Sequence, residues 1–250
     1  MVSVTICSQA VGLVLLLLVR PFVPSHAVAS DYLFGALGGV CGGIGIALLY
    51  HALSIGKMGV VSPITAVLAA ALPVGVSLAR GEFLSLAQGA GIALALVAIV
   101  MISFSHEEDG RREFATAGVR EAIACGLILG GFYVFLSYTH PQARLENLLA
   151  ARVASIGVLA VAGLALRQRF VPQRRDLPLV ILTGALDMTA NGLYVFATFN
   201  GYLAIAAVLT SLYPASTVAL ARIVLGERLR AMQKAGVGLA LAGVLLISLR

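Results

Sequence analysis

One acidic residue lies deep inside an apolar stretch of this 250-residue chain. Asp187 is about ten residues into the stretch 178–198, whereas the other ten of the eleven acidic residues lie in or near loops. If the stretch spans a bilayer, a charge at that depth costs at least about 2.5 kcal/mol, so it must be paired, protonated or in a wet cavity. Asn191, Tyr194 and Thr198 follow at helical spacing, on the same face as Asp187. The pattern predicts either a cavity wall or a polar stripe that joins helices.

One candidate for a basic partner of Asp187 lies in another apolar stretch. Arg152 is the only basic residue well inside such a stretch, 146–166. The depths of Arg152 and Asp187 differ by roughly 6 Å at about 1.5 Å per residue, which an arginine side chain can reach. In the rival interpretation Arg152 extends to the nearer membrane interface. We expect Asp187 to face a cavity and to bind either a proton or a cationic group of the ligand. Pairing with Arg152 would act oppositely, because it would keep the carboxylate ionised and favour direct ligand binding.

Prolines lie within two further apolar stretches. Pro63 and Pro73 are in 59–79, and Pro214 is in 202–222. A proline removes a backbone donor and leaves carbonyl groups that can face a cavity. Paired breaks in corresponding helices indicate a binding site near the membrane midplane, so we expect a gating role, with a static kink as the alternative. Further candidates for a cavity wall are Tyr133, Tyr138, Thr210, Ser211 and Tyr213.

Groups for catalysis or cofactor binding are missing from the sequence. The four histidines fall near the ends of apolar stretches, with no zinc-protease pattern, no Gly-x-Ser-x-Gly elbow and no phosphate-binding loop. Cys7, Cys41 and Cys125 lie far apart, without the spacing of a metal or redox pair. We therefore expect no enzymatic activity, no cofactor and no metal site.

The elements that carry these residues are predicted to be membrane-spanning helices. Hydrophobic residues make up 60% of the chain and charged residues 11%, where soluble domains have roughly 25% charged residues. A spanning helix needs roughly 20 mostly apolar residues. Unbroken apolar runs such as 11–19 exclude the alternating pattern of a membrane barrel. Nine stretches of this kind lie near residues 1–20, 33–53, 59–79, 85–104, 117–138, 146–166, 178–198, 202–222 and 232–249. The sequence thus predicts an all-α, polytopic membrane protein.

The sequence repeats itself at an offset of 145 residues. The segment GEFLSLAQGAGIALALVAIVMIS from Gly81 and the segment GERLRAMQKAGVGLALAGVLLIS from Gly226 are identical at eleven of twenty-three positions. The same offset aligns Gly39 with Gly184. Glycines four residues apart, as at 35, 39 and 43 and at 126 and 130, are expected to let helices approach closely.

The repeat divides the chain into two predicted halves. They cover residues 1–105 and 117–250, and the charged segment 106–116 is the linker. The second half has five predicted helices and the first has four, so we expect the first helix of the first half to be missing before Met1. Because five is an odd number, tandem halves would insert with opposite orientations, as inverted repeats do in many secondary transporters.

Two segments resemble the halves of EamA-type transporters of the drug/metabolite transporter superfamily. They are SLYPASTVALARIVLGERLRAMQKAGVGLALAGVLLIS and its weaker copy GKMGVVSPITAVLAAALPVGVSLARGEFLS. The shared marks are a proline inside the fourth and ninth helices of the family, a Gly-Glu turn and a glycine-rich closing helix in each half. The resemblance extends from the second of the family's ten helices to the last. It implies a multi-pass carrier of the inner or plasma membrane with a central cavity.

On this resemblance we expect a secondary transporter of a small metabolite or drug-like solute, which works by alternating access and favours export. The alternative is a non-transporting membrane component or the inactive remnant of a truncated transporter. The expected partners are the solute and membrane lipid; the net charge of +6 is assigned to loops that face lipid headgroups rather than to nucleic acid. A homodimer stays open. The orientation also stays open, because the family's cytoplasmic C-terminus conflicts with the distribution of basic residues.

Overall fold

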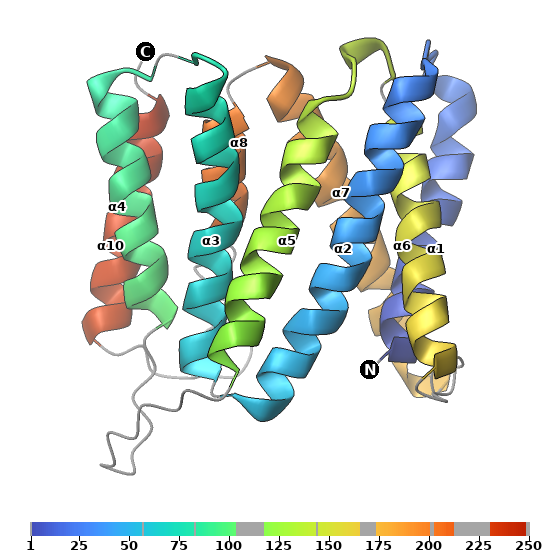
Figure 1. Cartoon of the computed structure of the whole chain (residues 1–250), viewed down its shortest axis with the longest axis horizontal. Coiled ribbons are helices and arrows are strands. Elements are labelled where there is room, and N and C mark those ends of the chain that lie inside the picture. Colours follow the sequence, from blue (N-terminus) through green and yellow to red (C-terminus); the bar gives the residue numbers. More distant parts are fainter. Residues whose placement is uncertain are drawn as a thin grey trace. The chain divides into compact units, whose positions relative to one another are not determined.

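The computed structural model describes residues 2–56, 58–82, 84–103, 118–143, 145–165, 174–200, 203–212 and 231–248. All regular structure in these ranges is helical. The α-helices are α1 (Val2–Val19), α2 (Ala29–Ile55), α3 (Met58–Ala79), α4 (Leu86–Ser103), α5 (Val119–Ser137), α6 (Glu146–Ala165), α7 (Leu177–Asn200), α8 (Leu203–Ser211) and α10 (Ala231–Ser248) (Figure 1). The prediction of an all-α fold is confirmed.

Several of these helices have the length and composition of membrane spans. Among the described residues, five are long and apolar enough: Val4–Phe22, Ala29–Ile55, Val119–Ser137, Glu146–Ala165 and Leu177–Phe199. Two shorter apolar helices cover Ile64–Ala79 and Leu86–Met101. Large apolar side chains also lie exposed along the helices, as at the many leucines of α7, which suits contact with lipid chains. The chain is therefore a multi-pass membrane protein.

The chain forms two compact units, each built from both predicted repeats. One contains Met1–Ala47 and Gly131–Asn200, and the other contains Leu48–Gly130 and Gly201–Arg250. Each unit therefore combines two segments that are far apart in the sequence. The division into repeats at 1–105 and 117–250 stays a prediction.

In the first unit, α2 crosses α6 at three glycines spaced four residues apart. A methyl group added at Gly35 or Gly39 would collide with a carbonyl oxygen of the α6 backbone. At Gly43 it would come within 3.1 Å of the carbonyl oxygen of Ser155. The absence of side chains thus lets the two backbones touch, as small residues do in membrane helix pairs. The prediction that these glycines serve helix packing is confirmed.

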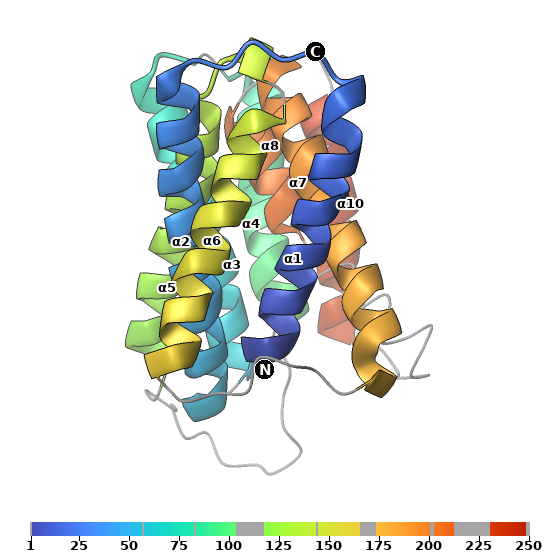
Figure 2. The same cartoon turned by 90° about the vertical axis from the view of Figure 1, so that its right-hand side faces the viewer.

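A second close crossing in the same unit involves α1, which packs against both α6 and α7 (Figure 2). A methyl group at Gly184 of α7 would collide with the carbonyl oxygen of Ser8 on α1. Gly39 makes the corresponding approach to the carbonyl oxygen of Ala151 on α6. Gly39 and Gly184 are the residues that the 145-residue offset aligns, so the two aligned glycines occupy comparable helix contacts.

In the second unit, α3 packs against α4 and α8, and α4 packs against α10 (Figure 1). A buried cluster joins Ala70 of α3, Ile92 and Ala95 of α4 and Val208 of α8. A glycine again allows the close approach of two helices, α10 and α4, since a methyl group at Gly243 of α10 would lie 2.9 Å from a carbonyl oxygen of α4. The packing role predicted for the glycines at 126 and 130 is also confirmed, because both face the backbone and Cβ atoms of α3.

The end of α3 is closed by a glycine cap. Gly81 has a φ of 79°, a left-handed conformation that favours glycine. The amide of Gly81 donates to the carbonyl oxygen of Leu78 at 3.0 Å, and the amide of Glu82 donates to that of Ser77 at 3.2 Å. This pair of bonds is the Schellman motif, which satisfies carbonyl groups that a helix end leaves open. The Gly-Glu turn noted in the sequence is therefore a helix stop; its counterpart at 226–227 lies outside the described residues.

Two of the three prolines that the sequence singles out, Pro63 and Pro73, lie in α3. The helix α3 continues past both Pro63 and Pro73, and the Pro73 side chain is buried. Pro214 lies outside the described residues, as does Tyr213. A gating role for the three prolines stays a prediction.

A polar cluster fastens the start of α2 to the loop between α5 and α6 in the first unit. The buried carboxylate of Asp31 accepts hydrogen bonds from the amides of Val28 at 3.0 Å and His140 at 2.8 Å. His140 Nδ1 lies 2.9 Å from the same carboxylate. The bond from Val28 caps the first turn of α2, as an acidic residue at a helix start does.

A second carboxylate in this cluster, Glu146, fastens the start of α6. It accepts from Arg20 Nε at 2.7 Å, from Ser25 Oγ at 3.2 Å and from Tyr32 Oη at 3.2 Å. These donors come from η1 (Arg20–Phe22), from the segment that follows it and from α2. The cluster thus fixes the relative positions of α1, α2 and α6 at one end of the unit.

We expect Asp31→Ala to lower the free energy of unfolding by about 3 kcal/mol, because the amides of Val28 and His140 both lose the buried carboxylate that accepts their hydrogen bonds. Asp176→Ala is the matched control. Asp176 is aligned with Asp31 at the 145-residue offset, but it is partly exposed, and its ion pair is with the exposed Arg175 at 3.6 Å. Such an exposed pair contributes about 0.5 kcal/mol or less. Denaturant unfolding of the purified protein in detergent measures both variants, and equal losses would contradict the role given to Asp31.

Candidate functional site

The centre of the candidate site is the guanidinium group of Arg152 on α6. Its side chain is 8% exposed. Nη2 donates to Oδ2 of Asp187 on α7, and Nη1 donates to Oε1 of Gln9 on α1. The predicted pairing of Arg152 with Asp187 is confirmed, and the alternative, extension of Arg152 to the membrane interface, is wrong. Three helices of the first unit therefore meet at one buried cation.

The local packing of α1 makes room for this cation. A methyl group at Gly12 would lie 3.5 Å from Arg152 Nε, so the guanidinium rests against the bare backbone of α1 at that point. Gly12 is three residues from Gln9, on the same helical face. On the α1 face that meets α6, the Gln9 amide therefore binds the guanidinium group, and Gly12 leaves room for it.

Asp187 is held from its own helix as well. Oδ1 of Asp187 accepts a hydrogen bond from Nδ2 of Asn191 at 3.3 Å, and the same nitrogen donates to the carbonyl oxygen of Asp187 at 2.8 Å. The two residues are one turn apart, which places their side chains together. The Asp187 side chain is 47% exposed, in contrast to the buried Arg152. The ion pair is therefore buried at its cationic end and open at its anionic end.

Tyr194 lies on the same face of α7 but is bonded elsewhere. The residue is buried, and its hydroxyl donates to the carbonyl oxygen of Tyr133 on α5 at 3.0 Å. The ring centres of Tyr194 and Tyr133 are 4.8 Å apart. Thr198 donates to the carbonyl oxygen of Val195 within α7 at 2.8 Å. The polar face predicted from the sequence thus splits into a charged part at Asp187 and Asn191 and a part that joins α7 to α5.

Two of the other predicted wall residues, Tyr138 and Thr210, have contacts of their own in the described structure. Tyr138 stacks on Phe34 with ring centres 5.4 Å apart. Thr210 belongs to the second unit, where its hydroxyl donates to the carbonyl oxygen of Ala206 at 2.8 Å. The side chain of Ser211 and all of Tyr213 lie outside what the structure describes.

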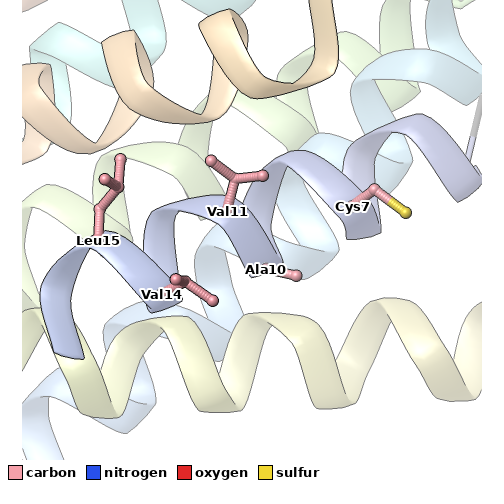
Figure 3. A pocket seen from close by; sticks show the side chains of 5 residues that line it. All are labelled: Cys7, Ala10, Val11, Val14 and Leu15. Carbon is pink, nitrogen blue, oxygen red and sulfur yellow. The ribbon is translucent and has the colours of Figure 1, made fainter. Parts of the chain in front are cut away.

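An apolar hollow of about 360 Å³ lies on α1 (Figure 3). It is lined by Cys7, Ala10, Val11, Val14 and Leu15. These side chains offer no charged group and no amide to orient a polar solute. The hollow therefore differs from the Arg152 cluster and is suited to contact with hydrocarbon.

Gln9 is the site residue that sequence reasoning missed. It is buried, with 5% of its surface exposed, and its only signal is composition: within Val2–Val19 it is the one residue with an amide or charged side chain. A buried amide in a spanning helix needs a partner, which makes such a residue a candidate. The sequence does not say which helix supplies that partner.

Residues 116–249 match the EamA-like transporter family, a segment that covers more than half of the chain. The chain belongs to this family. The matched segment of this EamA-like protein contains Arg152, Asp187 and Asn191. The family resemblance noted in the sequence is confirmed, and membership identifies a membrane transporter family.

Two further similarities agree with this assignment. The EamA-like chain is 30% identical over 121 residues to protein RarD of Streptomyces exfoliatus, and the match covers 46% of this chain and 38% of RarD. The matched region is thus well under half of that relative's length. A protein known from a crystal structure is 17% identical in sequence, with a TM-score of 0.65 and 96% of each chain covered. The latter likeness shows the fold alone.

Proposed function

We propose that this EamA-like chain is a secondary transporter of the cell membrane that exports a small metabolite or drug-like solute by alternating access. The carrying observation is the Arg152–Asp187 pair, buried at one end and open at the other. Ionisable groups within membrane helices are costly and mark solute or ion pathways. Family membership supports the transporter class.

In this proposal each polar residue of the cluster has a role. Asp187 is the group that the solute reaches first, because nearly half of its side chain is exposed. Asn191 orients the Asp187 carboxylate, and Arg152 supplies the positive charge behind it. Tyr194 shapes the adjoining wall through its bond to α5. Pro63, Pro73, Pro214 and Tyr213 complete the proposal, as kink residues and a wall residue respectively.

The second candidate function is a non-transporting membrane component. It is favoured by the internal pairing of the cluster, since Arg152, Gln9 and Asp187 satisfy one another as a structural joint between helices would. A transport assay separates the two. Proteoliposomes with the purified protein are loaded with a cellular metabolite extract, and the solutes that leave are identified by mass spectrometry against protein-free liposomes.

Asp187→Asn should lower the efflux rate at least tenfold per folded molecule, because it removes the exposed carboxylate while keeping the side-chain shape. Thr189→Val is the matched control on α7, since the exposed Thr189 hydroxyl donates within its own helix, to the carbonyl oxygen of Ala185 at 2.8 Å. If Asp187 carries a coupling proton, Asp187→Asn should abolish accumulation driven by a pH gradient and leave passive exchange measurable. Efflux by Asp187→Asn at the wild-type rate would mean that Asp187 only joins helices and takes no part in transport. No efflux from any sample would favour the non-transporting component.

A further inference from the structure

The two partners of Arg152 differ in charge and in exposure. Gln9 is neutral and buried, and its amide oxygen accepts a hydrogen bond from Nη1 of Arg152. Asp187 is anionic, its side chain is 47% exposed, and its carboxylate accepts a hydrogen bond from Nη2 of Arg152. In the part of the chain that the structure describes, Asp187 is the single acidic residue paired with Arg152. One negative charge therefore balances the buried cation, and that charge stands on the open side.

We infer that Arg152 is an exchangeable binding group for a carboxylate: the solute's carboxylate replaces that of Asp187 at Nη2. This inference rests on the proposed transport function and names its substrate class, a small organic acid or zwitterion. A guanidinium group matches the planar geometry of a carboxylate and binds it with charge-assisted hydrogen bonds. Because a buried cation without a counter-charge is strongly unfavourable, the site holds either Asp187 or the solute's carboxylate at all times.

Gln9 makes this exchange specific in the geometry seen here. By holding Nη1 it fixes the rotation of the guanidinium fork, so that Nη2 is directed toward the half-exposed side chain of Asp187. Because Gln9 carries no charge, it does not neutralise Arg152. A glutamate at this position would supply a permanent counter-charge from the buried side and remove the demand for a second anion.

A cationic solute fits the same cluster less well. A cation that approaches Asp187 would come close to the guanidinium group, which already donates to that carboxylate. Like charges this close repel strongly where water is scarce. The sequence alone favoured a proton or a cationic group as the ligand of Asp187; the observed pair and its buried amide instead favour an anionic group at Arg152.

Acetate tests this inference without knowledge of the natural solute. Asp187→Ala removes the internal carboxylate and opens space on the exposed side of Arg152. The full-length variant, purified in detergent, is unfolded thermally in sodium acetate and in sodium chloride of equal ionic strength. We expect acetate to raise the midpoint of Asp187→Ala by about 3 °C relative to chloride, because it binds the folded state at the vacated position.

Three controls should show no such acetate-specific shift. In the wild type, Asp187 already occupies Nη2. The double variant Asp187→Ala/Arg152→Gln lacks the cation, and Asp187→Ala/Gln9→Glu carries a counter-charge on the other side. Acetate that stabilises the Arg152→Gln double variant equally, or that leaves Asp187→Ala unchanged, would overturn the proposal. A shift with methylammonium chloride instead would assign the site to cations and overturn it as well.

If Asp187→Ala does not fold in chloride, recovery of folded protein replaces the midpoint as the readout. Purification in acetate should then raise the monodisperse yield at least fivefold for Asp187→Ala but not for Asp187→Ala/Arg152→Gln. This experiment measures binding alone, so a failed transport assay would leave a carboxylate site standing. Conversely, efflux by the wild type with no acetate effect in Asp187→Ala would remove only the carboxylate class of substrate.

Discussion

Asp187→Asn should destabilise the folded protein by about 3 kcal/mol, and Arg152→Gln by only about half as much. The asymmetry follows from the exposure of the two side chains, 8% for Arg152 and 47% for Asp187. Removing Asp187 leaves a buried guanidinium group with a neutral amide as its partner, whereas removing Arg152 leaves a carboxylate that is still half-exposed and bonded to Asn191. The buried, unpaired guanidinium group destabilises the folded state more than the half-exposed carboxylate does.

The double variant Asp187→Asn/Arg152→Gln should be more stable than Asp187→Asn alone, because no buried charge is left unpaired. Unfolding by sodium dodecyl sulfate, followed by circular dichroism of the purified protein, gives the three free energies. Equal losses in the two single variants, or losses that simply add in the double variant, would contradict the asymmetric pair.

The second large effect is expected at the crossing of α2 and α6. Gly39→Ala should lower the free energy of unfolding by about 3 kcal/mol, because the new methyl group would collide with the carbonyl oxygen of Ala151 and the backbones must separate. Gly157→Ala on α6 is the control, since nothing lies within 4 Å of a methyl group there. It should change stability by less than about 1 kcal/mol, toward greater stability.

The same unfolding titration compares the two glycine variants, and Gly184→Ala should behave like Gly39→Ala because it faces the carbonyl oxygen of Ser8. Similar stability of the Gly39 and Gly157 variants would show that the crossing tolerates a wider spacing than the structure indicates.

The helices were predictable because each spanning helix needs its own long apolar run, which is a local property of the sequence. The residues at which the helices begin and end were less predictable. The second apolar stretch was expected from residue 33, but α2 begins at Ala29 because Asp31 caps the amide of Val28. An aspartate beside an apolar run is typical of a loop as well as of a helix start, and only the contact decides between them.

The ion pair was predictable in outline, since the depths of Arg152 and Asp187 in their helices agree. The rest of the site depends on which helices are neighbours. Gln9 meets Arg152 across 143 residues of sequence, and Asp31 meets His140 across 109. No periodicity or spacing along the chain encodes such contacts, because they depend on which helices and loops become neighbours in the folded chain. The gating role of the prolines and the repeat boundaries stay predictions.

The two close crossings of the first unit differ in how they relate to the repeat. Ala151 and Ser8 receive the aligned glycines at 39 and 184, and each is followed in sequence by a residue of the buried cluster, Arg152 and Gln9 respectively. The offset of 145 residues that aligns the two glycines does not align these two residues, because it matches Arg152 with Cys7 and Gln9 with Ala154. The glycine contacts therefore follow the repeat, whereas the guanidinium group and the amide beside them each belong to one half of the sequence alone.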